Sequence, residues 1–432
     1  MIVIKGGRVI DPPKGIDRVA DILILDGKIS MIAENIHAEQ ARIIDARNKI
    51  VAPGFIDMHV HLREPGFEYK ETIRTGTMSA AVGGFTTVAC MPNTQPAIHS
   101  KEIVAYIRDK AEAEAIVNVL IIGSITEDIA GKKLTDIGEL VKSGIVAISD
   151  DGKTPMDMEI MERAFAEARR YGILLIDHCE DHQLTQGGSV NEGNASKRTG
   201  LKGIPSVAEW KIVKRDIALA KKYDACLHIA HVSTKESVEL IRRAKGKGIK
   251  VTCEVAPHHF TLTDEIVTRE NTYTKVNPPL RGQADVEAVI QGLRDGTIDM
   301  IATDHAPHDE GSKRVDYERA AFGISGLETA FAIAYTELVR KGRLTLHQLI
   351  DKMSCKPATI LGLDKGTLVV GSVADLVILD LEEEGVIDAC RFVSKGKNTP
   401  FHGRKVFGKV LYTLVGGKVV VEKGEIVCLS ID

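Results

Sequence analysis

The feature that most constrains the fold is a repeat of short apolar runs, each followed by a stretch with helical spacing. Eight such runs lie between residues 52 and 304, and most of them end about 23 to 32 residues after the previous one. Alternation of strand and helix is typical of a parallel sheet. Eight units predict a (β/α)8 barrel, in which functional residues lie at the carboxyl ends of the strands. The predicted strands are 52–61, 84–91, 117–123, 144–149, 173–178, 226–231, 250–254 and 298–304.

Two of the intervening stretches, 156–171 and 286–294, show helical periodicity clearly. Apolar residues recur in them at i, i+3, i+4 and i+7, which places these residues on one face of a helix. The gaps after residues 178 and 254 are longer and predict extra loop or helix. In the stretch 286–294 the periodic residues are Val286, Val289, Ile290 and Leu293.

Both ends of the chain are β-rich instead. Residues 1–51 and 366–432 alternate Val, Ile and Leu runs with Gly and Asp turns, which is typical of hairpins. We expect the two ends to pair into one small β unit beside a barrel formed by residues 52–365. The chain of 432 residues therefore has two structural units, although about 150 residues per domain gives a prior of about three.

Composition excludes several classes of function. The net charge of −4 and the pI of about 6.4 argue against a nucleic-acid or anionic-membrane surface. The seven cysteines form no C-x-x-C pair, as expected for a reduced cytosolic protein. The start, MIVIKGGRVI, lacks a signal-peptide core, and no apolar run approaches the roughly 20 residues of a membrane span. We therefore expect a soluble cytoplasmic protein with no nucleic-acid or membrane partner.

Unusual polar residues fall at the ends of the predicted strands. The first strand ends in Asp57-x-His59-x-His61. Side chains two residues apart on a strand share a face, so both imidazoles point into the barrel mouth. A lone strand-end histidine is more often a hydrogen-bonded core residue, but repetition around one array favours a metal centre. The other strand ends carry Asp150, Asp151, His178, His231 and Asp304.

The chemistry of this set indicates the metal. Imidazole and carboxylate without thiolate suit Zn²⁺, and less specifically Mn²⁺, Co²⁺ or Fe²⁺. Six protein ligands are too many for one tetrahedral zinc with an open position. They suit two ions that share a bridging carboxylate and a bridging hydroxide.

The motifs that carry these residues resemble those of the amidohydrolase superfamily and, more narrowly, of class I dihydroorotases. The resemblance covers essentially the whole chain and implies a (β/α)8 TIM barrel with a β-sandwich built from both termini. The motifs are PGFIDMHVHLREPG (53–66), GGFTTVACMPNT (83–94), ISDDGKT (148–154), HCED (178–181), EVAPHHF (254–260), NPPLR (277–281), ATDHAPH (302–308) and GSVADLVILD (371–380).

The resemblance also implies how the ligands divide between two zinc ions. Asp151, the second Asp of SDDGKT, resembles the bridging ligand. Many amidohydrolases use a carboxylated lysine there, so Lys153 remains an alternative bridge. Asp150 and Asp57 are expected to be supporting residues, as are His182, His228, His258, His259 and His305. The first ion is assigned His59, His61 and Asp304, and the second His178 and His231.

The implied substrate is dihydroorotate, and the reverse reaction closes N-carbamoyl-L-aspartate in de novo pyrimidine biosynthesis. The bridging hydroxide attacks the ring carbonyl, and Asp304 transfers the proton to the departing nitrogen. Arg63 beside the metal motif is expected to bind the substrate carboxylate, because guanidinium matches carboxylate bidentately. The other expected substrate contacts are His61, Asn93, Asn277, His308, Phe322 and Gly323.

Two alternatives stay open: an allantoinase or hydantoinase acting on five-membered cyclic ureides, and a non-catalytic scaffold. Arg63 and SDDGKT favour the dihydroorotase, and the full set of expected ligands disfavours the scaffold. The family implies a homodimer or assembly with aspartate carbamoyltransferase. The charged loop 308–314, which contains glycine, is a candidate mobile cover of the site.

Overall fold

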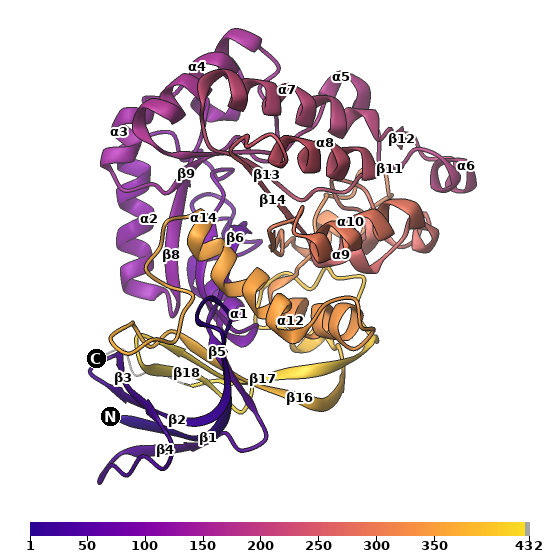
Figure 1. Cartoon of the computed structure of the whole chain (residues 1–432). Helices are drawn as coiled ribbons and strands as arrows, with labels where there is room; N and C mark the ends of the chain where they lie inside the picture. The colour runs from indigo at the N-terminus through magenta and orange to yellow at the C-terminus, as the bar shows by residue number, and fades with distance from the viewer. Residues whose placement is uncertain (428–432) are drawn as a thin grey trace.

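The computed structural model describes residues 1–427 and contains a parallel eight-stranded barrel (Figure 1). Its strands follow one another in chain order, and every neighbouring pair is parallel. A parallel bridge between Val60 and His305 joins the first strand to the end of the last unit. The predicted (β/α)8 barrel is confirmed. Its strands are β6 (Phe55–Val60), β7 (Phe85–Cys90), β8 (Asn118–Gly123), β9 (Ala147–Ile148), β10 (Leu174–Asp177), β13 (Leu227–Ile229), β14 (Val251–Val255) and β15 (Met300–Ile301).

Helices that follow the strands bury one apolar face each. In α4 the Asp157 side chain accepts hydrogen bonds from the backbone N–H groups of Glu159 and Ile160, so the helix begins two residues after the predicted start. Gly172 ends it at φ 64°, a left-handed cap that glycine adopts without strain. The main outer helices are α1 (Ile73–Val82), α2 (Lys101–Glu114), α3 (Ile137–Lys142), α4 (Met158–Tyr171), α7 (Val207–Tyr223), α8 (Lys235–Lys245), α10 (Gln283–Asp295) and α12 (Ala330–Ala334).

The longer gaps hold extra elements, as predicted. Those between β10 and α7 are α5 (His182–Thr185), β11 (Val190–Asn191), α6 (Asn194–Thr199) and β12 (Gly203–Ile204). After β14 comes α9 (Pro257–Thr261), and after β15 comes α11 (Glu310–Lys313). The chain leaves the barrel through α13 (Leu346–Ile350) and α14 (Lys356–Ile360).

The two ends of the chain form one hydrogen-bonded sheet, in which the indigo and yellow strands of Figure 1 lie together. Strand β5 joins them, because it pairs with β1 on one side and with β16 on the other. Side chains from both halves enclose a single core that includes Ile22 and Leu376, as in a sandwich. The strands are β1 (Ile2–Asp11), β2 (Ile16–Leu25), β3 (Lys28–Ala33), β4 (Arg42–Asp45), β5 (Ile50–Pro53), β16 (Leu376–Val386), β17 (Lys405–Val415), β18 (Lys418–Glu422) and β19 (Glu425–Ile426).

The β unit predicted from the termini is thus confirmed, with β5 running two residues past the predicted boundary at 51/52. The boundaries themselves stay predictions, and residues 428–432 of the second segment lie outside the described part of the chain.

The terminal sheet packs where the first barrel strands begin. The Phe55 ring lies 5.8 Å from that of Phe85 and 5.5 Å from that of Phe331. A Cβ at Gly84 would meet Val410 of β17 at 3.1 Å, so this close approach requires glycine. The opposite, carboxyl ends of the strands are left for the site.

The six cysteines within residues 1–427 are free, and Cys428 lies outside that range. None of the described helices has the length and apolar character needed to cross a membrane.

Candidate metal centre and active site

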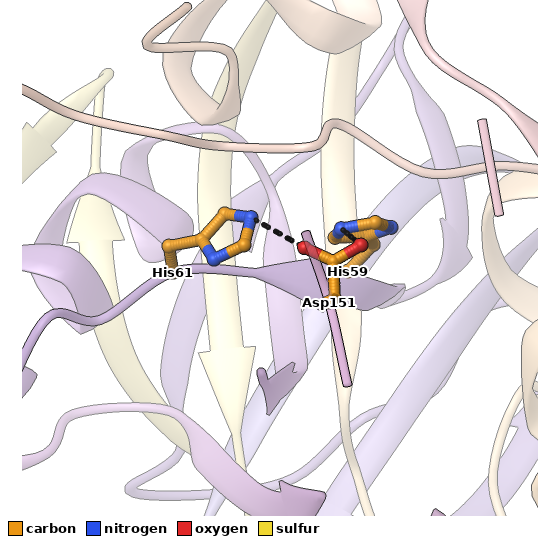
Figure 2. Close-up of side chains that lie close together, drawn as sticks. All are labelled: His59, His61 and Asp151. Atoms are coloured by element: carbon orange, nitrogen blue, oxygen red, sulfur yellow. Dashed lines mark ion pairs between the residues drawn. The ribbon is translucent and has the colours of Figure 1, made fainter. Parts of the chain in front are cut away.

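Strand β6 brings His59 and His61 to the carboxyl end of the barrel, where both face Asp151 (Figure 2). The Asp151 carboxylate lies between the two rings. Its Oδ1 is 3.4 Å from Nε2 of His59, and its Oδ2 is 3.6 Å from Nε2 of His61. These three buried side chains can offer one ligand atom each to a single ion.

A second group of three shares the same aspartate. Oδ1 of Asp151 lies 3.4 Å from Nδ1 of His178 and 3.7 Å from Nε2 of His231. The two ring nitrogens are 2.8 Å apart. Two candidate metal sites therefore meet at one carboxylate.

Asp304 adjoins the first group. Its Oδ1 lies 3.2 Å from Nε2 of His61 and 3.5 Å from Nε2 of His59. The structure thus brings together all six residues that the sequence assigned to metal: His59, His61, Asp151, His178, His231 and Asp304.

The electrostatics of this centre favour a cation. Nε2 of His59 and Oδ1 of Asp151 are buried and have no hydrogen-bond partner within the described chain. Burial opposes protonation of His59, but the carboxylates of Asp151 and Glu254 raise its pKa well above the ordinary value. Buried polar atoms are seldom left unpaired. Nitrogen and carboxylate donors around one space fit a metal ion such as zinc.

Two carboxylates at the centre, the buried Glu254 and the half-buried Glu180, escaped the sequence analysis. Glu254 is the penultimate residue of β14, and its Oε1 lies 2.5 Å from Nδ1 of His59. Glu180 follows β10, and its Oε2 lies 3.0 Å from Nε2 of His178. The sequence offered two signals for these residues. One is a glutamate within the predicted strand 250–254, and the other is a glutamate that follows His178 by two positions.

Two of the residues expected to be supporting, Asp57 and Asp150, are buried and accept backbone hydrogen bonds. Asp57 accepts hydrogen bonds from the backbone N–H groups of His59 and Thr303, and so ties the first strand to the last. Asp150 accepts from the N–H groups of Ile125 and Thr126.

Lys153, the alternative bridge, is exposed, and its Nζ donates to the carbonyl oxygen of Ile129 at 3.3 Å. The Asp151 carboxylate, in contrast, lies within 3.7 Å of a ring nitrogen of each of the four histidines. The geometry therefore favours Asp151 as the shared residue.

A cavity of about 200 Å³ opens onto the centre. Arg63 lines it and is 9% exposed, with no carboxylate paired to it within residues 1–427. Burial lowers the pKa of Arg63 to about 10. Its Nε donates to the Pro307 carbonyl oxygen at 3.3 Å, but a buried cation without a counter-ion is unfavourable, so the cavity suits an anionic ligand. Every residue expected to bind substrate lines this cavity: His61, Arg63, Asn93, Asn277, His308, Phe322 and Gly323.

Hydrogen bonds that involve His308, Phe322 and Asn398 hold one wall of the cavity in place. Nε2 of His308 lies 2.8 Å from the Phe322 carbonyl oxygen. Asn398, which the sequence analysis missed, accepts from the His308 N–H and donates to the carbonyl of Gly323. In the loop 308–314, Lys313 is fully buried and donates to the carbonyl of Ala321 at 2.7 Å. Mobility of this loop stays a prediction.

Three cavity residues adopt left-handed backbone conformations. Arg63, His231 and Asp304 have φ of 64°, 29° and 48°. Such conformations are unfavourable for residues other than glycine, and they cluster at functional sites.

The barrel, the strand-end histidines and the shared aspartate define an amidohydrolase with a metal centre. Comparison with known proteins agrees. The dihydro-orotase-like family matches residues 48–237, and the amidohydrolase family matches residues 292–421. The chain is 53% identical over 422 residues to the dihydroorotase of Acetivibrio thermocellus, covering 98% of this chain and 99% of that one. It is also 53% identical over 424 residues to that of Caldanaerobacter subterraneus subsp. tengcongensis, covering 98% of each. This chain belongs to the dihydroorotase family.

Similar solved structures are hydantoinases. The L-hydantoinase of Arthrobacter aurescens has a TM-score of 0.90 and 31% identity, covering 99% of this chain and 97% of that one. The D-hydantoinase of Bacillus sp. AR9 has a TM-score of 0.88 and 27% identity, covering 99% and 96%.

Proposed function

We propose that this chain is a zinc-dependent dihydroorotase that interconverts dihydroorotate and N-carbamoyl-L-aspartate in pyrimidine biosynthesis. One observation carries the proposal: an aspartate shared by both candidate metal groups lies beside a cavity lined by a buried arginine. Within residues 1–427 this arginine has no carboxylate partner. Asp151 belongs to both candidate metal groups, and Arg63 lines the adjoining cavity. Together they suit a hydrolysis centre for a small anionic ring.

Six residues would hold two zinc ions, and Asp151 would be the residue they share. Bound zinc would polarise the ring carbonyl and lower the pKa of water toward 7. His59, His61 and Asp304 are assigned to the first ion, and His178 and His231 to the second. The shared carboxylate and the four neutral donors supply the ligand types that zinc prefers.

The chain's own groups do the remaining work. Arg63 binds the substrate carboxylate and thereby fixes the ring. Asn93 accepts from Nδ1 of His61 at 2.9 Å, which leaves its amide N–H groups free for the substrate. Asn277, His308, Phe322 and Gly323 form the remaining contacts.

Asp304 transfers the proton. It faces the cavity as an ionised carboxylate, so it accepts the proton of the attacking water and delivers it to the ring nitrogen as the C–N bond breaks. The same residue reverses these steps when the ring closes.

A hydantoinase is the second candidate, because the similar solved structures carry that name. The identity of 53% to curated dihydroorotases and the buried Arg63 favour a carboxylate-bearing ring. The test is turnover by the purified zinc-loaded protein of dihydroorotate, hydantoin and allantoin. Turnover of dihydroorotate alone is expected, whereas turnover of hydantoin or allantoin without dihydroorotate would refute the proposal.

The family resemblance also supports a cytoplasmic homodimer or an assembly with aspartate carbamoyltransferase. Light scattering of the protein alone, and after mixing with that enzyme, tests both arrangements.

A further inference from the structure

Each candidate metal group contains one histidine that contacts a glutamate belonging to neither group. The ring nitrogen that faces Asp151 is called the inner nitrogen, and the one that contacts the glutamate is called the outer nitrogen. Nδ1 of His59 contacts Glu254 at 2.5 Å, and Nε2 of His178 contacts Glu180 at 3.0 Å. A carboxylate accepts hydrogen bonds and does not donate them. Each glutamate therefore places the ring proton on the outer nitrogen and leaves the inner nitrogen with a lone pair.

The inner nitrogens point where an ion is required. Nε2 of His59 is buried and has no hydrogen-bond partner in the described chain, and it lies 3.4 Å from Asp151. Nδ1 of His178 lies 3.4 Å from the same carboxylate. The two histidines thus present opposite nitrogens to the centre, and only a fixed proton position on each ring achieves this.

We propose that Glu254 and Glu180 are positioning residues, one for each ion: Glu254 orients His59 toward the first ion, and Glu180 orients His178 toward the second. This inference rests on the two-ion centre of the proposed function. A carboxylate behind a ligand histidine fixes its ring and raises its basicity, and loss of such a partner commonly weakens metal binding about 10- to 100-fold.

Each glutamate also has a second side-chain partner. Oε2 of Glu254 lies 3.2 Å from Nε2 of His228, whose Nδ1 lies 2.8 Å from the Thr252 hydroxyl. This series of hydrogen bonds lies in the barrel interior, away from the cavity.

Glu180 instead contacts a residue that lines the substrate cavity. Its Oε2 also accepts a hydrogen bond from Nδ2 of Asn277 at 2.7 Å. Within residues 1–427, Oδ1 of Asn277 accepts no hydrogen bond, and Asn277 lines the cavity. Glu180 therefore turns this amide so that its oxygen can accept a ring N–H. Glu180 acts on both the second ion and the substrate, whereas Glu254 acts on the first ion alone.

The test is a zinc-release titration of the zinc-loaded protein with a chromophoric chelator, together with KM for dihydroorotate. The variants are Glu254→Met and Glu180→Met, which keep bulk but lose the acceptor, and Glu254→Gln and Glu180→Gln, which keep one acceptor oxygen. We expect each Met variant to weaken one ion about 10- to 100-fold and to leave the other within about threefold. Each Gln variant should recover most of the affinity. Only Glu180→Met should also raise KM.

Glu382→Met is the matched control, since Glu382 is an exposed glutamate on β16 of the terminal sheet, and its zinc release should equal that of wild type. Equal weakening of both ions in a Met variant, or no weakening, would overturn the inference. Because Glu180 lies on a loop and is half-buried, the Glu180 pair decides the matter if Glu254→Met does not fold.

The wild-type protein separates the two proposals. If it releases two ions but the variants show no selectivity, the positioning role fails and the proposed function stands. If it holds one ion, the two-ion centre fails. The positioning role is then upheld if one Met variant weakens that ion and overturned if neither does.

Discussion

Oδ1 of Asp304 lies 3.2 Å from Nε2 of His61, at the edge of the cavity that both residues line. The carboxylate therefore contacts a proposed metal ligand and also faces the space for substrate. Burial opposes its ionisation, but His59 and His61 hold the pKa of Asp304 well below its ordinary value. The ionised carboxylate is the form that can accept a proton.

Asp304→Asn should keep the fold and abolish most of the turnover. The amide retains the size and one oxygen but cannot act as a base, and general acid–base catalysis contributes about 10²- to 10⁴-fold to rate. We expect kcat to fall by about 10³-fold, measured at saturating zinc with the bound metal quantified. The melting temperature serves as the control. A kcat within threefold of wild type at full metal content would remove Asp304 from the chemistry.

Asp151→Ala should weaken both ions, since the aspartate belongs to both groups. The expected result is a metal content well below that of the wild-type protein after dialysis, measured by atomic absorption. Lys153→Met is the matched variant, because Lys153 is exposed and its Nζ donates to a backbone carbonyl. It should retain the wild-type metal content and activity. Loss of metal in Lys153→Met with retention in Asp151→Ala would make the lysine the bridge.

The ligands could be predicted from the sequence because a strand alternates its side chains. Once β6 is placed, His59 and His61 must share a face, and the carboxyl ends of parallel strands meet at one rim. Likewise, the β-rich ends could be assigned to a second unit from their turn pattern. Strand β5 joins its two halves.

The partners of the ligands could not be predicted in this way. Glu254 meets His59 across 195 residues, and Asn398 meets His308 across 90. Such contacts depend on the register around a closed barrel and on the path of the terminal segment over its rim. Neither the register nor this path produces a periodic pattern in the sequence. Glu180 was overlooked for a different reason, since a glutamate on a polar loop is normally solvated.

Arg63→Met should raise KM for dihydroorotate by about 100-fold. The variant keeps an unbranched apolar stem but loses the charged guanidinium, and hydrogen bonds to charged groups contribute about 1.5 to 3 kcal/mol. Dihydrouracil, a ring of the same size without the carboxylate, provides the control ligand, and its inhibition constant should change by less than threefold. An equal loss with both ligands would mean that Arg63 shapes the cavity rather than binding the carboxylate.

The buried amine of Lys313, close to the cavity wall, is expected to make the free energy of unfolding depend on pH. Burial, with a smaller effect of Lys275, lowers the pKa of Lys313 to about 7. Its ordinary value in an unfolded chain is about 10.4. Between these values the unfolded chain binds a proton that the folded chain has released. The free energy of unfolding therefore rises with pH across this window, by at most about 1.4 kcal/mol per pH unit.

Lys313→Met should remove this slope. Urea unfolding at pH 7, 8 and 9 measures it, with Lys132→Met, an exposed lysine, as the control that keeps the wild-type slope. Because Nζ of Lys313 also donates to Ala321, beside Phe322, the variant should raise KM for dihydroorotate modestly. Identical slopes in Lys313→Met and wild type would show that Lys313 keeps its ordinary pKa in the folded protein, so that the buried amine stays charged above pH 7.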